Sequence, residues 1–219
     1  MNRSEFVCNC IRNTFNHDQG LLGELEQTAR ERNVPIITRE TACLLTVLGR
    51  LAKPLRILEI GTAIGYSSIL LARILAPGGR IDTIERDEEM LLMARENIRK
   101  AGLGDVIGII AGDATEVLKC LDKQYDMVFL DAAKGQYPEL LPDCLRLLKR
   151  GGLLVADNVL YKGLVAGDDT PARKHRTIVN RMRAFLEDLR NNPELETCIV
   201  PAGDGVAVAY KLLEEEMEQ

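Results

Sequence analysis

Several kinds of residue are scarce or missing in this sequence, and each absence excludes a class of protein. The 219 residues include no tryptophan, two histidines and six cysteines, and no C-x-x-C pair occurs. Without paired cysteine spacing, a disulfide-rich secreted fold is not indicated. No apolar run approaches the ~18 residues of a membrane span, and the opening stretch MNRSEFVCNCIRNTF lacks the apolar core of a signal peptide. We therefore expect a cytoplasmic protein.

The few cysteines and histidines carry little predicted chemistry. Cys8 and Cys10 leave a metal contact open, although no cluster of further ligands follows them. His17 and His175 have no ligand partner at useful spacing and are expected at the surface. The other cysteines lie in apolar contexts and are expected in the core: Cys43, Cys120, Cys144 and Cys198.

What remains is the composition of an ordinary globular domain. Apolar residues make up 46% and charged residues 28% of the chain, which is enough to bury a sizeable core. The length fits a single domain, 1–219. The formal net charge of −5 argues against general nucleic-acid binding, but it leaves room for a local basic patch.

Short apolar runs alternate with amphipathic runs through most of the chain. Strands are expected at 54–60, 80–85, 106–112, 125–131 and 151–157, and helices at 66–76, 87–102, 114–121 and 137–149. This alternation predicts an α/β fold of the Rossmann-like type, with a mostly parallel sheet and helices on both faces. Runs such as MVFL and LLVA fit strands that are covered on both sides.

The two ends of the chain depart from this alternation. After a helix expected at 171–190, the stretch ETCIVPAGDGVAVAYK predicts two strands joined by a turn at 203–205, so one edge of the sheet becomes antiparallel. Residues 3–52 are expected to be mostly helical, with Pro35 separating one helix from the next. The single domain is thus divided into an N-terminal helical segment, 1–52, and an α/β core, 53–219.

Each predicted parallel strand ends in a polar group. In open α/β sheets, ligands bind beyond the carboxyl ends of the strands. The groups at these ends are Glu59, Glu85, Asp113, Asp131 and the pair Asp157 and Asn158. Any one of them alone fits ordinary turn chemistry. Five in succession at equivalent positions predict a shared binding edge.

The stretch EIGTAIGYS predicts a cofactor site. Gly61 and Gly65 let the backbone approach a ligand at a helix N-terminus, and their G-x-x-x-G spacing differs from the G-x-G-x-x-G of dinucleotide binders. Glu59 puts a negative charge where a pyrophosphate would sit, which favours a ligand with an amino group. Glu85 is placed to accept hydrogen bonds from a ribose diol, and Asp113 to face an adenine amino group. An adenosine with an amino-acid arm and no phosphate is S-adenosylmethionine.

Three hard oxygen ligands follow the last two parallel strands, namely Asp131, Asp157 and Asn158. Mg²⁺ is typically held by one or two carboxylates together with water and substrate, and the lack of nearby histidine or cysteine argues against zinc. Lys134, one short turn after Asp131, could deprotonate a substrate hydroxyl that the metal has acidified. The alternatives are strand-end turns that bind nothing and a solvated loop lysine.

At this point the sequence resembles the metal-dependent class I O-methyltransferases, the group of catechol and caffeoyl-CoA O-methyltransferases. The resemblance runs from about PIITRETACLL to the final hairpin. The stretches that carry it are LEIGTAIGYSS, DTIERD, GDA, DMVFLDAAKGQY and LLVADNVLYKG. It implies a seven-stranded sheet, a homodimer, and S-adenosylmethionine and Mg²⁺ as cofactors.

The same resemblance implies roles for individual residues. The implied cofactor contacts are Glu85 at the ribose, Asp113 and Ala114 at the adenine, and Ile37 and Ser67 at the methionine end, with Asp131 beside the sulfonium. The implied metal ligands are Asp131, Asp157 and Asn158. Lys134 is the implied general base.

The chain departs from the catechol enzymes directly after the metal aspartate. Where those enzymes carry histidine and tryptophan, this chain has Ala132 and Ala133, so the aromatic residues that clamp a flat phenol are missing. The stretches DNVLYKGLV and ARKHRTIVNRMRAFLEDL are similar to one bacterial branch, the tRNA 5-hydroxyuridine methyltransferases, which convert wobble 5-hydroxyuridine to 5-methoxyuridine. That resemblance implies tRNA as the substrate, and the uracil O5 and O4 are vicinal oxygens like those of a catechol.

The helix expected at 171–190 carries an independent indication of an RNA partner. Its apolar stripe is Ile178, Met182, Phe185 and Leu189. Its first turns carry the cations Arg173, Lys174 and Arg176, which oppose the helix dipole at roughly 0.3–1 kcal/mol each. A phosphate partner would explain that choice, and a solvated charged face is the alternative.

Arg181 and Arg183 lie further along the same helix, and three more cations could extend this basic patch if they lie on the same edge: Lys149, Arg150 and Lys162. We therefore predict an enzyme that methylates 5-hydroxyuridine in tRNA. A small catechol-like or hydroxycinnamoyl substrate is the alternative within the same class. A binding protein without catalysis is disfavoured by the set Asp131, Lys134, Asp157 and Asn158, and an NAD dehydrogenase by the glycine spacing.

Overall fold

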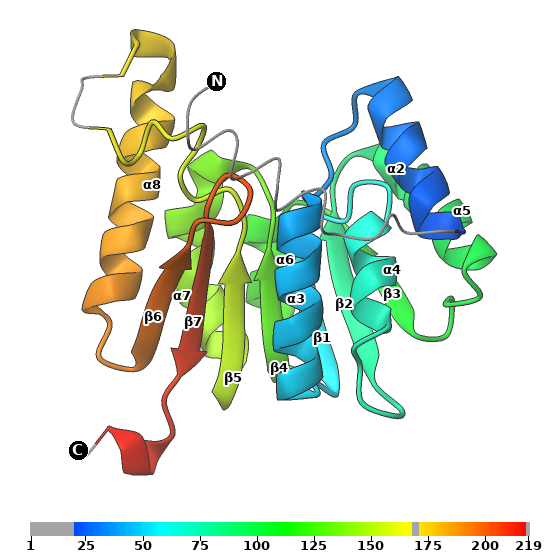
Figure 1. The fold of residues 1–219 in the computed structure, drawn as a ribbon. Coiled ribbons are helices and arrows are strands. Elements are labelled where there is room, and N and C mark those ends of the chain that lie inside the picture. The colour runs from blue at the N-terminus through cyan, green and yellow to red at the C-terminus, as the bar shows by residue number, and fades with distance from the viewer. Residues whose placement is uncertain (1–19, 168–170, 218–219) are drawn as a thin grey trace.

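One seven-stranded sheet with helices on both sides forms the body of the protein (Figure 1). A computed structural model describes residues 20–167 and 171–217. The strand order is β3-β2-β1-β4-β5-β7-β6, with β7 antiparallel to both of its neighbours and the other pairs parallel. The predicted fold, including the antiparallel C-terminal hairpin, is confirmed.

The strands are β1 (Arg56–Ile60), β2 (Arg80–Glu85), β3 (Ile107–Ala111), β4 (Tyr125–Leu130), β5 (Leu148–Ala156), β6 (Leu195–Val200) and β7 (Val206–Lys211). The α-helices are α2 (Leu21–Arg32), α3 (Arg39–Ala52), α4 (Tyr66–Ala72), α5 (Glu88–Lys100), α6 (Ala114–Cys120), α7 (Tyr137–Leu147) and α8 (Arg173–Asn191). Two 3₁₀ turns, η1 (Lys134–Gln136) and η2 (Glu214–Glu216), complete the description.

The central strand β4 shows how one apolar run serves two cores. Because side chains alternate across a strand, Met127 and Phe129 enter the core formed with α2, α3, α4 and α5. Val128 and Leu130 enter the core formed with α6, α7 and α8. All four side chains are fully buried. A strand covered on both faces must be apolar at every position, and this explains the run MVFL.

Side-chain caps define where several helices begin. Thr38 accepts a hydrogen bond from the backbone N–H of Thr41 at the start of α3, and Asp87 accepts one from Met90 at the start of α5. Pro35 lies between α2 and α3, as predicted. Residues 3–19 of the predicted helical segment, together with Cys8, Cys10 and His17, lie outside the described residues.

Strand β5 begins earlier than the sequence predicted. It starts at Leu148, which pairs with Tyr125, and the register then shifts before Met127 pairs with Leu153. Gly151 sits at this irregularity with φ +76°, a conformation that glycine adopts without steric cost. The GG pair therefore lies inside the strand, whereas the prediction placed it at the start.

The predicted core position of the cysteines is wrong for most of them. Cys144 is fully buried in α7, as expected. Cys120 and Cys198 are exposed and Cys43 is half-buried. Cys120 is the last residue of α6, and Cys198 lies on β6 at the edge of the sheet, where one strand face is open. In the described part of the chain, no helix combines the length and the apolar character needed to cross a membrane.

Candidate active site

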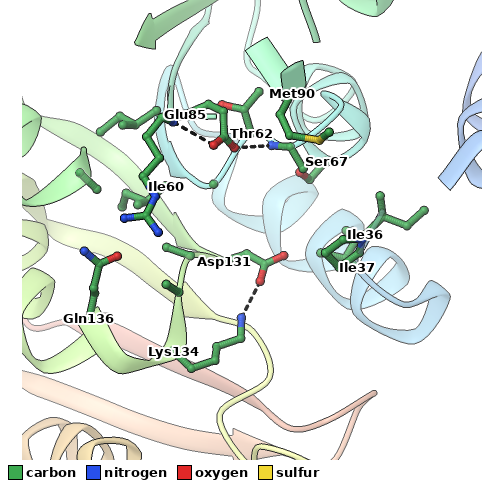
Figure 2. Close-up of a pocket in the computed structure, with 18 of the residues that line it drawn as sticks. Ile36, Ile37, Ile60, Thr62, Ser67, Glu85, Met90, Asp131, Lys134 and Gln136 are labelled. Carbon is green, nitrogen blue, oxygen red and sulfur yellow. Dashed lines mark hydrogen bonds and ion pairs between the residues drawn. The ribbon is translucent and has the colours of Figure 1, made fainter. Parts of the chain in front are cut away.

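A cavity of about 430 Å³ lies at the carboxyl ends of the parallel strands, closed on one side by the segment between α2 and α3. Figure 2 shows Glu85, Thr62, Ser67 and Met90 in one part of it, and Asp131 and Lys134 in another, with Ile36 and Ile37 alongside. The predicted residues that line it are Ile37, Gly61, Ser67, Glu85, Asp113, Ala114, Asp131, Lys134 and Asn158. These residues, distant in sequence, therefore share one site.

Glu85 is held in a fixed orientation at the end of β2. Its carboxylate accepts hydrogen bonds from the backbone N–H groups of Ala63 at 2.9 Å, Arg86 at 2.8 Å and Asp87 at 2.9 Å. A carboxylate has about four lone-pair directions, so acceptor capacity is left for the cavity. A preset acceptor of this kind suits a vicinal diol such as that of ribose.

The two glycines predicted to approach a ligand are required for a different reason. A Cβ on Gly61 would lie 2.1 Å from the backbone oxygen of Asp131, so Gly61 lets β1 and the end of β4 come together. Gly65 adopts φ +85° as the N-cap of α4, and it does not line the cavity. Its role is to make the turn into the helix. Only Gly61 has the predicted cavity position.

Glu59 is placed differently from the prediction, because it lies beneath the cavity. The residue is fully buried and is absent from the cavity lining. One carboxylate oxygen accepts hydrogen bonds from the hydroxyls of Ser68 and Thr83, and the other has no partner among the described residues. Burial raises the pKa of Glu59 to about 7, although the nearby hydroxyls of Ser67, Ser68 and Thr83 oppose this.

Asp113 at the start of α6 is already engaged. Its Oδ1 caps the helix through the backbone N–H of Thr115 at 3.0 Å, and its Oδ2 accepts from Nη1 of Arg86 at 3.0 Å. Hydrogen bonds from Thr115, followed by Arg86, lower the pKa of Asp113 to about 2. Arg86 also lines the cavity. Sequence reasoning missed Arg86, although it directly follows Glu85.

Asp157 provides the strongest structural indication of a cation site. It is fully buried at the end of β5. Its Oδ1 accepts from the hydroxyl of Thr41 at 3.2 Å and from the backbone N–H of Asn158 at 2.8 Å. Its Oδ2 has no hydrogen-bond partner in the described structure. Burial, and then the nearby charge of Asp131, raise the pKa of Asp157 to about 6.

A buried carboxylate oxygen without a partner is costly unless something pairs with it. A divalent cation would satisfy Oδ2, and Asp131 and Asn158 supply the other hard oxygens that such a cation takes. Asn158 has φ +55°, a left-handed conformation that asparagine tolerates better than most residues. In residues 20–167 and 171–217, no cluster of three or more His, Cys, Asp or Glu side chains suits a metal. The donors of the set Asp131, Asp157 and Asn158 are all oxygens, which fits Mg²⁺ better than zinc.

Lys134 sits in the first turn after β4 and faces the same carboxylate. Its Nζ lies 2.7 Å from Oδ1 of Asp131 and donates to the hydroxyl of Tyr137 at 2.9 Å (Figure 2 shows the Asp131 contact). Burial alone would lower the pKa of Lys134, but Tyr137 and Asp131 raise it above its ordinary value. Tyr137 is fully buried, and its hydroxyl lies 3.0 Å from the carbonyl oxygens of Leu130 and Asp157. The lysine is therefore held by a rigid neighbour.

The cations of α8 divide into two groups. Arg173, Lys174 and Arg176 are exposed on the first turns, where no acidic residue and no side-chain cap occur. Helix α8 begins at the edge of the sheet where the parallel strands end (Figure 1). These three residues therefore lie toward the same edge as the cavity.

Four of the other cations do not extend the patch, whereas Lys162 is exposed on the loop that follows β5. Arg181 and Arg183 donate to backbone carbonyls of neighbouring loops. Lys149 and Arg150 are at the start of β5, on the opposite edge of the sheet, where they pair with Asp126 and Glu194. The proposed membership of Lys149 and Arg150 was wrong, because they lie at the start of β5 and the cavity lies at the other end of that strand.

Several residues that line the cavity were not predicted from the sequence. They include Val34, Pro35, Ile36, Thr62, Ala63, Tyr66, Met90 and Gln136. Most are apolar or come from a segment before the sheet, and only tertiary folding brings them there. His175 was expected to be a lone surface group, but its Nδ1 lies 3.0 Å from the hydroxyl of Tyr161.

Known proteins match this chain over nearly all of its length. A family profile described as O-methyltransferase matches residues 13–212. A catechol O-methyltransferase of Niastella koreensis is 32% identical over 216 residues, covering 94% of this chain and 96% of the relative. A caffeoyl-CoA O-methyltransferase of Populus kitakamiensis is 35% identical over 179 residues, covering 77% and 74%. The crystal structure of an O-methyltransferase of Streptomyces achromogenes in complex with S-adenosylmethionine superposes with a TM-score of 0.84 at 31% identity, covering 97% of this chain and all of that one.

Proposed function

This chain belongs to the family of S-adenosylmethionine-dependent O-methyltransferases, and from that premise we propose a divalent-metal-dependent enzyme that methylates 5-hydroxyuridine in tRNA. The observation that carries the metal dependence is the buried Oδ2 of Asp157, which has no hydrogen-bond partner in residues 20–167 and 171–217. It lies at the end of β5, next to the strand that ends before Asp131. In the described structure, a bound cation or protonation of Asp157 would compensate this oxygen, and the neighbouring oxygens of Asp131 and Asn158 favour the cation.

The cofactor end of the site is built from residues of this chain that are already oriented. Glu85 presents its carboxylate to the cavity for the ribose diol, and Ser67 and Ile37 line the part assigned to the methionine arm. S-adenosylmethionine supplies the methyl group from its sulfonium and leaves as S-adenosylhomocysteine. Asp113 and Ala114 line the part assigned to the adenine.

The metal end combines binding with proton transfer. Asp131, Asp157 and Asn158 would hold a Mg²⁺ ion, whose positive charge would supply the acidification of the substrate hydroxyl. Lys134 accepts the hydroxyl proton, and the oxygen takes the methyl group in line from the sulfonium. A lysine paired with a bare carboxylate stays protonated, so the action of Lys134 as a base requires the charge of Asp131 to be offset.

Three features support tRNA as the substrate. The exposed cations Arg173, Lys174 and Arg176 lie toward the cavity edge on a helix whose first turn carries no acid, which suits a phosphate backbone. Ala132 and Ala133 line the cavity where bulky aromatic residues would narrow it. The O5 and O4 of 5-hydroxyuridine offer the vicinal oxygens that the metal end needs.

A small catechol-like or hydroxycinnamoyl substrate is the second candidate. The curated relatives from Niastella koreensis and Populus kitakamiensis are named for catechol and caffeoyl-CoA. Such substrates also present two vicinal oxygens, so the metal end serves either class. The homodimer and the cytoplasmic location stay predictions; analytical ultracentrifugation tests the first.

The deciding experiment offers the enzyme labelled S-adenosylmethionine with hypomodified tRNA, catechol and caffeoyl-CoA, each with Mg²⁺ or with EDTA. We expect label in tRNA only when Mg²⁺ is present. Label in catechol or caffeoyl-CoA alone would refute the tRNA substrate, and turnover that survives EDTA would refute the metal.

The matched variants are Asp157→Ala and Asp122→Ala. Asp122 is exposed on the loop after α6, so its loss should leave turnover unchanged. Asp157→Ala should abolish Mg²⁺-dependent turnover while S-adenosylhomocysteine still binds, as measured by calorimetry. Full activity in Asp157→Ala would remove this residue from the site.

A further inference from the structure

Helix α8 contacts both loops that border the candidate active site. Nη1 of Arg181 donates to the carbonyl oxygen of Gly135 at 2.6 Å and lies 2.8 Å from Oε1 of Glu139. Arg183 donates to the carbonyl oxygens of Val165 at 3.1 Å and Gly167 at 2.5 Å. Gly135 directly follows the proposed base, and the second loop follows the proposed metal ligand at 158.

The turn that carries Lys134 depends on such outside contacts. The 3₁₀ turn η1 has no buried residue and no side-chain cap. A Cβ built on Gly135 would meet no atom of the described residues within 4 Å. A short turn with no buried residue and no cap of its own has little local stability, so the hydrogen bond from Arg181 to its carbonyl adds to the contacts with Asp131 and Tyr137 that already orient Lys134.

Helix α8 also packs against Tyr137, the hydrogen-bond partner of Lys134. Phe185, four residues after Arg181, packs edge-on against the ring of Tyr137, with ring centroids 5.2 Å apart and an interplanar angle of 69°. Residues four apart lie on one helix face. The hydroxyl of Tyr137 accepts a hydrogen bond from Lys134. One face of α8 thus supports both the turn and the side-chain partner of the base.

We propose that Arg181 is a positioning residue for the proton-transfer step, which holds the Lys134 turn in its working geometry through the carbonyl of Gly135. This inference rests on the proposed function, in which Lys134 is the base. It also links the proposed RNA contact with the proton-transfer step, because Arg181 and the exposed cations lie on the same helix, α8. RNA bound to those cations would contact the element that positions the base.

The exposure of the contact separates positioning from stability. The side chains of Arg181 and Glu139 are 44% and 53% exposed, and ion pairs this open contribute little to folding. A change at Arg181 should therefore alter the position of the turn more than the stability of the protein. Phe185, which is fully buried, would not allow this distinction.

The test compares Arg181→Met, Arg181→Lys and a control, Arg190→Met, in the full chain with Mg²⁺. Arg190 is exposed in the last turn of the same helix. We expect Arg181→Met to lower kcat about 10- to 100-fold, since small misplacements of a reacting group have effects of this size. The KM values for S-adenosylmethionine and tRNA should stay within about twofold, and Arg181→Lys, which can still donate to Gly135, should recover most of kcat.

Several outcomes would overturn the inference. An unchanged kcat in Arg181→Met refutes positioning, and a rise in the KM for tRNA alone would make Arg181 a phosphate contact. If Arg181→Met does not fold, Glu139→Gln serves in its place, because it removes the charge that holds the guanidinium. We expect a smaller fall in kcat there, and no fall would also refute the inference.

Failure of the proposed function can be told apart from failure of the Arg181 inference by the substrate that the wild type methylates and by the kcat of Lys134→Met. If the wild type methylates catechol and not tRNA, the substrate proposal fails, and the Arg181 effect is then measured on catechol. Lys134→Met provides the remaining control. If it keeps the wild-type kcat, Lys134 is not the base, and the Arg181 inference falls with it, whatever the substrate.

Discussion

At the scale of single residues, burial decides what each acid can do. Glu85 and Glu59 both stand near the ends of neighbouring strands, yet one faces the cavity and the other lies beneath it. Glu85 accepts hydrogen bonds from three backbone N–H groups. Glu59 is closed off from solvent, and one of its oxygens has no partner among the described residues. A carboxylate in that position is stable mainly in its protonated form.

Glu59→Gln should therefore change how stability depends on pH. The pKa of Glu59 rises from its ordinary value of 4.5 to about 7 on folding. Below pH 4.5 Glu59 is protonated in both the folded and the unfolded protein, so its burial costs no free energy of protonation. As the pH rises to 7, the unfolded chain loses the proton first, so stability falls by about 3 kcal/mol and then levels off.

The measurement is urea unfolding of wild type and variant from pH 4.5 to 8. The stability of Glu59→Gln relative to wild type should grow by about 3 kcal/mol across this range. Glu187→Gln, at an exposed position on α8, is the matched control and should track the wild type. Parallel curves for Glu59→Gln would show that this carboxylate is ionised or solvated in the folded protein.

At the scale of elements, α8 combines a structural face with an exposed basic start. Val179, Met182, Phe185 and Leu189 are fully buried against the sheet, and the predicted Ile178 is only partly buried beside them. The N-terminal turns instead present cations at the end of the helix where acids are favourable. A helix optimised for stability alone would not be built in this way.

Reversing these charges should raise the stability of the protein and weaken its binding of tRNA. Arg173→Glu with Lys174→Glu should raise the free energy of unfolding by roughly 0.3–1 kcal/mol per residue, because acids suit a helix N-terminus. The same change should weaken tRNA binding and lower the slope of log K against log salt by about 0.7–0.9 for each phosphate that the variant no longer neutralises. Filter binding at several salt concentrations, together with thermal unfolding, measures both effects.

The control is Arg190→Glu at the other end of α8, which also reverses a charge but lies away from the cavity edge. It should leave tRNA affinity nearly unchanged. If the double reversal raises stability and leaves tRNA binding as it was, the basic turns are a solvated face and not an RNA contact.

At the scale of the whole molecule, the cavity joins segments from most of the chain. Ile36 precedes α3, Met90 is on α5, and Asn158 follows β5, yet all three line one space. A ligand that contacts them together binds the folded chain and not the unfolded one. Its binding energy therefore adds to the stability of the whole fold.

S-adenosylhomocysteine at about 100 times its Kd should add about 2.7 kcal/mol to stability. For a chain of this length that corresponds to a rise in Tm of roughly 5–10 °C. Glu85→Gln should lose most of this ligand-dependent rise, whereas Glu88→Gln, exposed in the first turn of α5, should keep it. Differential scanning fluorimetry with and without the ligand checks both, and an equal rise in the two variants would remove Glu85 from the cofactor site.

The alternation of strands and helices and the set of strand-end acids could be predicted from the sequence, because both depend on local patterns. Apolar runs such as MVFL fit strands that are covered on both sides, and parallel strands bring their carboxyl ends to one edge. Thus Glu85, Asp131 and Asn158 were predicted to meet, and all three line the cavity.

What local pattern leaves open is which groups are buried and which partners they meet. The packing of distant residues decides whether Glu59 faces a ligand. It also decides whether Gly61 makes room for the cofactor or for the backbone of Asp131. In the same way, it decides whether Arg181 binds phosphate or the carbonyl of Gly135. Burial, close approach and pairing arise only when separate elements pack. The sequence by itself therefore determined which acids and amides follow the parallel strands. The tertiary structure decided the arrangement that holds Lys134 against Asp131.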